Sequence, residues 1–135
     1  MAFAPISGEE VEALPIRLEI DHRRRSVSVT ADGIVGLADM LGYFETLTAA
    51  GAMPYAKLFD ARTVDSRLSD DDMAVLARAV RANATFDPRG PIAAVATTPQ
   101  ARAAIERFKA LGGARRPIEV FETVEGAKAW LALRR

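Results

Sequence analysis

The sequence contains no cysteine and only one histidine, His22, and these two scarcities exclude several classes of site. Without cysteine the chain forms no disulfide, offers no thiol nucleophile and binds no metal through thiolates. A single histidine cannot build a histidine metal cluster, and we identify no nucleophile near His22 that it could activate. We therefore predict no metal site, no cofactor and no catalytic constellation.

An excess of charge of one sign and long apolar runs are also lacking. The 18 basic residues balance 18 acidic residues, so net charge gives no reason to expect nucleic-acid binding. No apolar run approaches the ~18 residues of a membrane span, and residues 1–10, MAFAPISGEE, lack the positive start and the long apolar core of a signal peptide. Together with the absence of cysteine, these features favour a cytoplasmic protein.

What the sequence does contain is a regular alternation of strand and helix patterns. Residues 1–14 show no hydrophobic period and are predicted to be a loose lead-in. From residue 15 to residue 133 the patterns alternate without a repeat or an internal linker, which predicts one domain over 15–133.

The order of these patterns predicts an α/β fold. Two alternating strands, joined by a polar turn and ended by Asp32 and Gly33, form a hairpin, and three further strands each lie between helices. Strands separated by helices pair in parallel, so the order β-β-α-β-α-β-α-β-α predicts a mostly parallel sheet of about five strands. The hairpin adds an antiparallel edge strand, and helices should cover both faces. The predicted segments after the hairpin are 36–50, 55–60, 69–84, 92–96, 101–111, 118–121 and 123–131.

The predicted helix 36–50 is apolar over more than one face, and Ile34, Val35 and Tyr43 widen its apolar surface. Two interpretations stay open. Either this surface is covered by the amino-terminal segment or a loop, or it is an exposed surface for a second copy of the chain, a lipid or another ligand.

The stretch 55–72 combines an apolar strand, the carboxylate of Asp60 and a helix that opens at Ser69. Ser69 followed three residues later by Asp72 predicts a capping box in which Asp replaces Glu. The run Asp70–Asp72 belongs to the first helical turn, where the macrodipole favours negative charge, and its side chains diverge too far to share a cation.

The chain resembles the STAS domain, the domain of sulfate transporters and anti-sigma-factor antagonists, and in particular its SpoIIAA-like branch. The resemblance covers roughly residues 15–133 and is carried by LFDAR at 58–62, IAAVATTP at 92–99 and VFETVEGAKAWL at 120–131. It implies the fold above and a non-enzymatic binding module, because members of this branch also look like small SEC14-type lipid-binding modules.

The resemblance also implies a candidate phosphorylation site. Antagonist members are phosphorylated on a serine within an Asp-Ser-Ser-Gly run at the start of the helix after the third strand. Counting from Asp60 without gaps places Ser69 and Asp70 on the two serine positions, whereas matching the Asp-Ser pair selects Ser66. Both alignments stay open, and the glycine of the run is missing.

The predicted binding site lies beyond the carboxyl ends of the parallel strands, where open α/β sheets bind their ligands. The residues expected at this edge are Asp60, Arg62, Thr97, Thr98, Glu122 and Thr123, with Ser66 and Ser69 nearby. Each also has a local structural interpretation. Ser69 and Thr123 can cap helices, and Asp60 can pair with Arg62 or Arg67.

These observations lead to three functional hypotheses. The first is a stand-alone, non-enzymatic STAS-like module that binds a partner protein or a small or lipid-like ligand, either as a monomer or as a homodimer. The second is a small enzyme that uses Asp60 as acid or base and Arg62 to hold an anion. The third is peripheral membrane association through helix 36–50.

Overall fold

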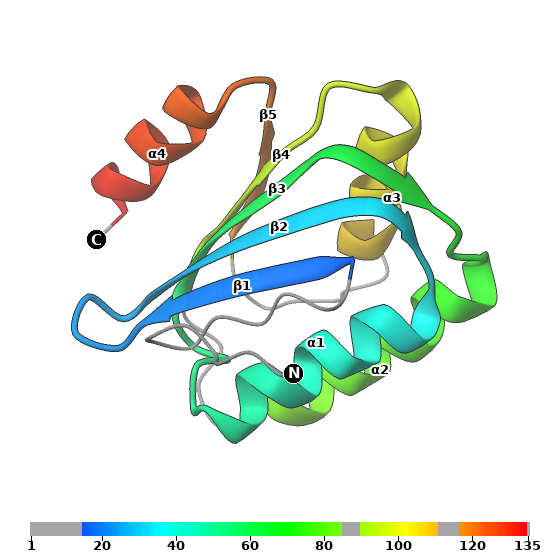
Figure 1. The fold of residues 1–135 in the computed structure, drawn as a ribbon, viewed down its shortest axis with the longest axis horizontal. Coiled ribbons are helices and arrows are strands. Elements are labelled where there is room, and N and C mark those ends of the chain that lie inside the picture. Colours follow the sequence, from blue (N-terminus) through cyan, green and yellow to red (C-terminus); the bar gives the residue numbers. More distant parts are fainter. Residues whose placement is uncertain (1–14, 85–89, 111–116, 135) are drawn as a thin grey trace, which may run out of the picture.

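The computed structural model describes residues 15–84, 90–110 and 117–134, and they form five strands and four helices in the predicted order (Figure 1). The lead-in 1–14 lies outside the described residues. The elements are β1 (Ile16–Asp21), β2 (Ser26–Val35), α1 (Leu37–Ala49), β3 (Ala56–Ser66), α2 (Asp70–Ala84), β4 (Ile92–Val95), α3 (Pro99–Ala110), β5 (Ile118–Phe121) and α4 (Val124–Leu133).

The sheet has the strand order β1-β2-β3-β4-β5, with β1 antiparallel to β2 at the edge and all other pairs parallel. Crossovers between parallel strands share one hand, and here each new strand is added on the same side of the previous one. The three crossover helices α1, α2 and α3 must therefore cover the same face. Helix α4 follows the last strand, is not a crossover, and covers the other face (Figure 1).

Each face has its own core. Strand β1 alternates between buried and exposed residues, so Ile16, Leu18 and Ile20 pack with β2, α1 and α2. On the opposite face, Ala127 of α4 packs against β4, and Trp130 and the other inward residues of α4 surround this contact. The prediction of a mostly parallel sheet with helices on both faces is confirmed. No helix within the described residues is both long and apolar enough to cross a membrane.

Strands β2 and β3 both run further than the sequence indicates. The expected ends were Asp32–Gly33 and Asp60, but the two strands continue together until Val35 pairs with Ser66. Strand β4 pairs with β3 only as far as Asp60, so part of the extension of β3 is exposed to solvent. This exposure explains why the extension contains polar residues. The prediction that the strand ends at Asp60 is therefore wrong, because residues 61–66 continue β3.

The predicted apolar surface near α1 needs a correction. Val35 and Tyr43 are only 2% and 5% exposed, because Val35 faces the helices from the inner side of β2 and Tyr43 packs with Phe44 and Phe59. Ile34, which points to the opposite side of β2, is 59% exposed. Of the three residues only Ile34 belongs to the surface, and the inward side of α1 is covered by the sheet.

Gly90 precedes β4 with a φ of +111°, and a Cβ at this position would collide with the backbone carbonyl of Pro54. We expect Gly90→Ala to lower the free energy of unfolding by about 2 kcal/mol or more, through backbone strain and the clash. The matched control is Gly42→Ala inside α1, where a Cβ meets open space. That control should raise stability by roughly 0.5–1 kcal/mol. Urea unfolding measures both, and equal effects of the two substitutions would contradict this account.

Candidate functional site

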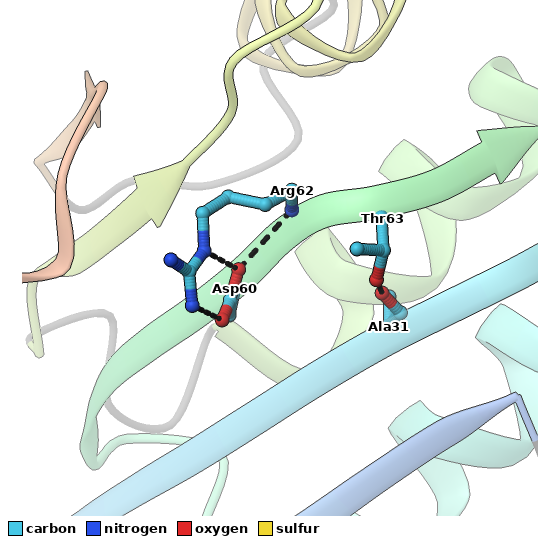
Figure 2. A network of polar contacts seen from close by, with 4 residues as sticks. All are labelled: Ala31, Asp60, Arg62 and Thr63. Carbon is cyan, nitrogen blue, oxygen red and sulfur yellow. Dashed lines mark hydrogen bonds and ion pairs between the residues drawn. The ribbon is translucent and has the colours of Figure 1, made fainter.

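Asp60 and Arg62, both on β3, form an ion pair in which both carboxylate oxygens of Asp60 bind the guanidinium of Arg62 (Figure 2). Asp60 Oδ1 accepts hydrogen bonds from the backbone N–H of Arg62 at 3.1 Å and from its Nε at 2.9 Å. A terminal nitrogen of the Arg62 guanidinium donates to Asp60 Oδ2 at 2.7 Å. The predicted pairing of Asp60 with Arg62 is confirmed, whereas Arg67 pairs with Asp65 at 3.0 Å.

The hydrogen bonds from the Arg62 side chain hold the pKa of Asp60 below its ordinary value, against an opposing contribution from burial. A general acid or base works best with a pKa near the working pH, so a carboxylate kept this acidic is a weak base. The same pairing raises the pKa of Arg62, with a smaller contribution from Glu125 at the start of α4.

This pair lies on a β-bulge. Thr30 is opposite Asp60 but Asp32 is opposite Thr63, so β3 contains one more residue than β2 across this step. The Thr63 hydroxyl donates to the carbonyl oxygen of Ala31 at 3.5 Å on the far side of the bulge (Figure 2). A bulge re-aims the side chains that follow it, and Asp60 binds the backbone of the bulge itself.

The bulge changes which residues of β3 face the helices. Before it, Phe59 and Ala61 point toward α1, α2 and α3, and simple alternation would continue with Thr63 and Asp65. After the extra residue, Val64 and Ser66 take these inward positions instead, since they line the same cavity as Phe59 and Ala61.

The cavity lies between the inner face of the sheet and helices α1, α2 and α3, and its volume is about 140 Å³. Its wall is apolar apart from Lys57 and Ser66. The lining residues are Ala31, Val35, Met40, Tyr43, Phe44, Leu47, Met53, Lys57, Phe59, Ala61, Val64, Ser66, Leu68, Met73, Leu76, Val80, Ile92, Ala94, Ala101, Ala104, Ile105, Phe108 and Ile118.

Lys57, which is not among the predicted site residues, is only 3% exposed. Its Nζ donates to the carbonyl oxygens of Met53 and Tyr55 at 2.5 and 2.7 Å, so it secures the turn between α1 and β3. A lysine within the otherwise apolar run 55–59 was the available signal, because buried lysines are rare and need partners.

The two candidate serines have different surroundings. The Ser69 hydroxyl accepts from the backbone N–H of Asp72 and the Asp72 carboxylate accepts from the N–H of Ser69, both at 3.0 Å. The predicted capping box is therefore confirmed. The Ser66 Oγ, in contrast, is the one buried side-chain oxygen or nitrogen of the described residues that has no hydrogen-bond partner.

The remaining predicted residues lie where the short strands end. The register aligns Asp60 with Val95 and Val95 with Phe121, so the segments after β4 and β5 leave the sheet at the level of Asp60. Thr98 and Thr123 accept hydrogen bonds from helical N–H groups of α3 and α4, at 3.1 and 3.0 Å. The capping role of Thr123 is confirmed. Thr97 is exposed, and Glu122 lies 3.9 Å from Arg102.

Asp70 and Asp72 of the aspartate run, and His22, each contact other side chains or the backbone of the protein. Asp70 lies 3.5 Å from Arg107 of α3, and Asp72 belongs to the capping box. His22 Nδ1 lies 2.8 Å from the Tyr55 hydroxyl, and Arg25 stacks over the Tyr55 ring at 4.9 Å. The hairpin turn is thereby anchored to the segment before β3.

The chain has an α/β fold of the SpoIIAA-like type. It is similar to the crystal structure of an uncharacterised protein of the DUF3478 family, with a SpoIIAA-like fold, from Shewanella loihica PV-4. The TM-score is 0.57 at 17% sequence identity, over 97% of this chain and 99% of the other. The predicted resemblance to the SpoIIAA-like branch is thus supported at the level of fold. No protein-family model and no curated protein matches the sequence.

The Asp60–Arg62 pair predicts a pH-dependent stability. Because the pKa of Asp60 is lowered in the folded state, its stabilising contribution is present at neutral pH and is lost as pH falls through that lowered pKa. Asp60→Asn should therefore be less stable than the wild type at pH 7, and the difference should shrink below about pH 4. Urea unfolding between pH 3 and pH 7 measures it, with Glu45→Gln as an exposed control. A difference that stays constant down to pH 3 would contradict the role of the ion pair.

Lys57 gives a second prediction. Lys57→Met keeps the length and apolar stem of the side chain but removes the donor to the Met53 and Tyr55 carbonyl oxygens. We expect the free energy of unfolding to fall by roughly 1–3 kcal/mol, because buried carbonyl groups lose a partner. The control, Lys128→Met on the exposed surface of α4, should change it by less than about 0.5 kcal/mol. A Lys57→Met variant as stable as the wild type would refute this role.

Proposed function

We propose that this protein is a binding module for a small, mainly apolar molecule, which occupies the cavity between the sheet and helices α1, α2 and α3. The observation that carries the proposal is the volume and chemistry of this cavity, about 140 Å³ lined almost entirely by apolar side chains. The space is partly open at the protein surface, so a small molecule can reach its apolar lining.

The size of the cavity sets the size of the ligand. In another protein, an apolar cavity of about 150 Å³ stays dry and binds benzene. The cavity of this chain is close to that volume and equally apolar in its helical wall, where Ala101, Ala104 and Phe108 of α3 face Leu76 and Val80 of α2. A group of about the size of benzene matches this space, either as a whole ligand or as part of a longer lipid-like molecule.

The two alternative functions have weaker support. The Asp60–Arg62 pair satisfies its own charges and holds the bulge, which accounts for these residues without a reaction. Membrane association through α1 would use its outward side, but both aromatic residues of that helix, Tyr43 and Phe44, are buried, as is Leu47. Its other large apolar residues, Leu37, Met40 and Leu41, are partly buried against the core. Binding in the interior is therefore the function that the geometry favours.

Benzene binding tests the proposal, and the methionines provide the probe. Met40, Met53 and Met73 all line the cavity, so we expect benzene to shift their methyl resonances in ¹³C-methionine-labelled protein. Benzene at ten times its Kd should add about 1.4 kcal/mol to the free energy of unfolding. For a chain of this length the midpoint of thermal unfolding, Tm, should rise by roughly 4–8 °C.

A matched pair of variants on α3 provides the control. Ala104 lines the cavity, whereas Ala103 is exposed on the same helix. Ala104→Leu should fill part of the cavity and abolish both the methionine shifts and the rise in Tm, while Ala103→Leu should respond like the wild type. If benzene leaves the methionine resonances of the wild type unchanged, or if Ala104→Leu binds it equally well, the proposal fails.

A further inference from the structure

Ser66 is, with Lys57, a polar exception in the otherwise apolar cavity wall, and it differs from Lys57, whose Nζ donates to two backbone carbonyl oxygens. It is the last residue of β3 and lines the cavity, and its Oγ is buried with no hydrogen-bond partner. An unsatisfied buried hydroxyl is unfavourable, and proteins satisfy nearly all such groups. Alanine would fill the same place on the wall without this penalty, so packing alone does not account for a serine.

The bulge explains how the serine reaches this wall. Without the extra residue in β3, Asp65 would face the helices and Ser66 would face the other side of the sheet. The shift from Thr30–Asp60 pairing to Asp32–Thr63 pairing reverses this arrangement. The Asp60–Arg62 pair that fixes the bulge thus also fixes Ser66 against the cavity.

From these two observations we infer that the natural ligand carries one hydroxyl or carbonyl group on an otherwise apolar body of about the size of benzene, and that the Ser66 hydroxyl hydrogen-bonds this group. The inference rests on the proposed function, because it names the class of ligand for the same cavity. A serine hydroxyl both donates and accepts, so it serves an alcohol, a phenol, an aldehyde or a ketone. In the structure Oγ has no exposed surface, so a rotation about χ1 to another staggered position must turn it toward the bound polar atom.

Phenol and benzene test this inference because they differ by one hydroxyl group. Their dissociation constants are measured by methionine-methyl NMR on wild type, Ser66→Ala and Ser69→Ala. We expect the ratio of the benzene Kd to the phenol Kd to fall by roughly fivefold in Ser66→Ala, the effect of one net hydrogen bond. Ser69→Ala removes a hydroxyl from an exposed helix cap, so its ratio should equal that of the wild type.

The outcomes separate the two proposals. If both compounds bind but Ser66→Ala leaves the ratio unchanged, the role of Ser66 is overturned and the apolar site stands. If neither compound binds the wild type, both proposals are overturned.

Stability without ligand gives an independent readout. The Tm of Ser66→Ala should equal or exceed that of the wild type, because the substitution removes an unsatisfied hydroxyl. A Tm clearly below that of the wild type would show that the hydroxyl has a structural partner, and would also overturn the inference.

Discussion

The extra residue in β3 opposite Ala31 is the constraint on which the arrangement of the interior depends. Side chains alternate along a strand, so one inserted residue exchanges the inner and outer sets for everything that follows. The hydrogen bonds from Arg62 to the carboxylate of Asp60 span this insertion. Upstream of it, Phe59 faces the helices, and downstream of it Ser66 does. The position of Ser66 in the cavity wall is therefore a consequence of the bulge.

The cavity itself follows from the distribution of small residues. The three crossover helices share one face of the sheet, and where α3 meets the central strands four of the lining residues are alanines: Ala61 and Ala94 from the sheet, Ala101 and Ala104 from the helix. Alanine on both sides of an interface leaves space that larger side chains would fill. The opposite face has a single helix whose inward Ala127 is fully buried and is surrounded by Trp130 and Leu131. The cavity therefore lies on the face of the sheet that α1, α2 and α3 cover, and not on the face that α4 covers.

Short sequence patterns predicted those parts of the structure that depend on residues near one another in the sequence. The order of elements followed from hydrophobic periodicity, and the caps at Ser69 and Thr123 followed from side-chain chemistry at helix starts. The ends of β2 and β3 could not be predicted in this way, because residues there are held by pairing between strands that are distant in sequence. The burial of Val35 and Tyr43, the partners of Lys57 and the cavity also depend on contacts across the fold, which no local pattern contains.

The fold alone does not determine what occupies the cavity. A chain that shares the architecture at 17% identity can differ at every lining position, and ligand choice is set by those side chains, not by the topology. In this chain the sequence directed attention to the polar edge around Asp60, yet the charges there neutralise one another in a closed pair. The hydroxyl group without a hydrogen-bond partner belongs instead to Ser66, at the end of β3, in the wall of the apolar cavity. A buried polar group without a hydrogen-bond partner is stronger evidence for a ligand-binding site than a surface charge that is already paired. The proposed binding site therefore lies on the interior face of β3, and the Asp60–Arg62 pair spans the bulge that positions Ser66 there.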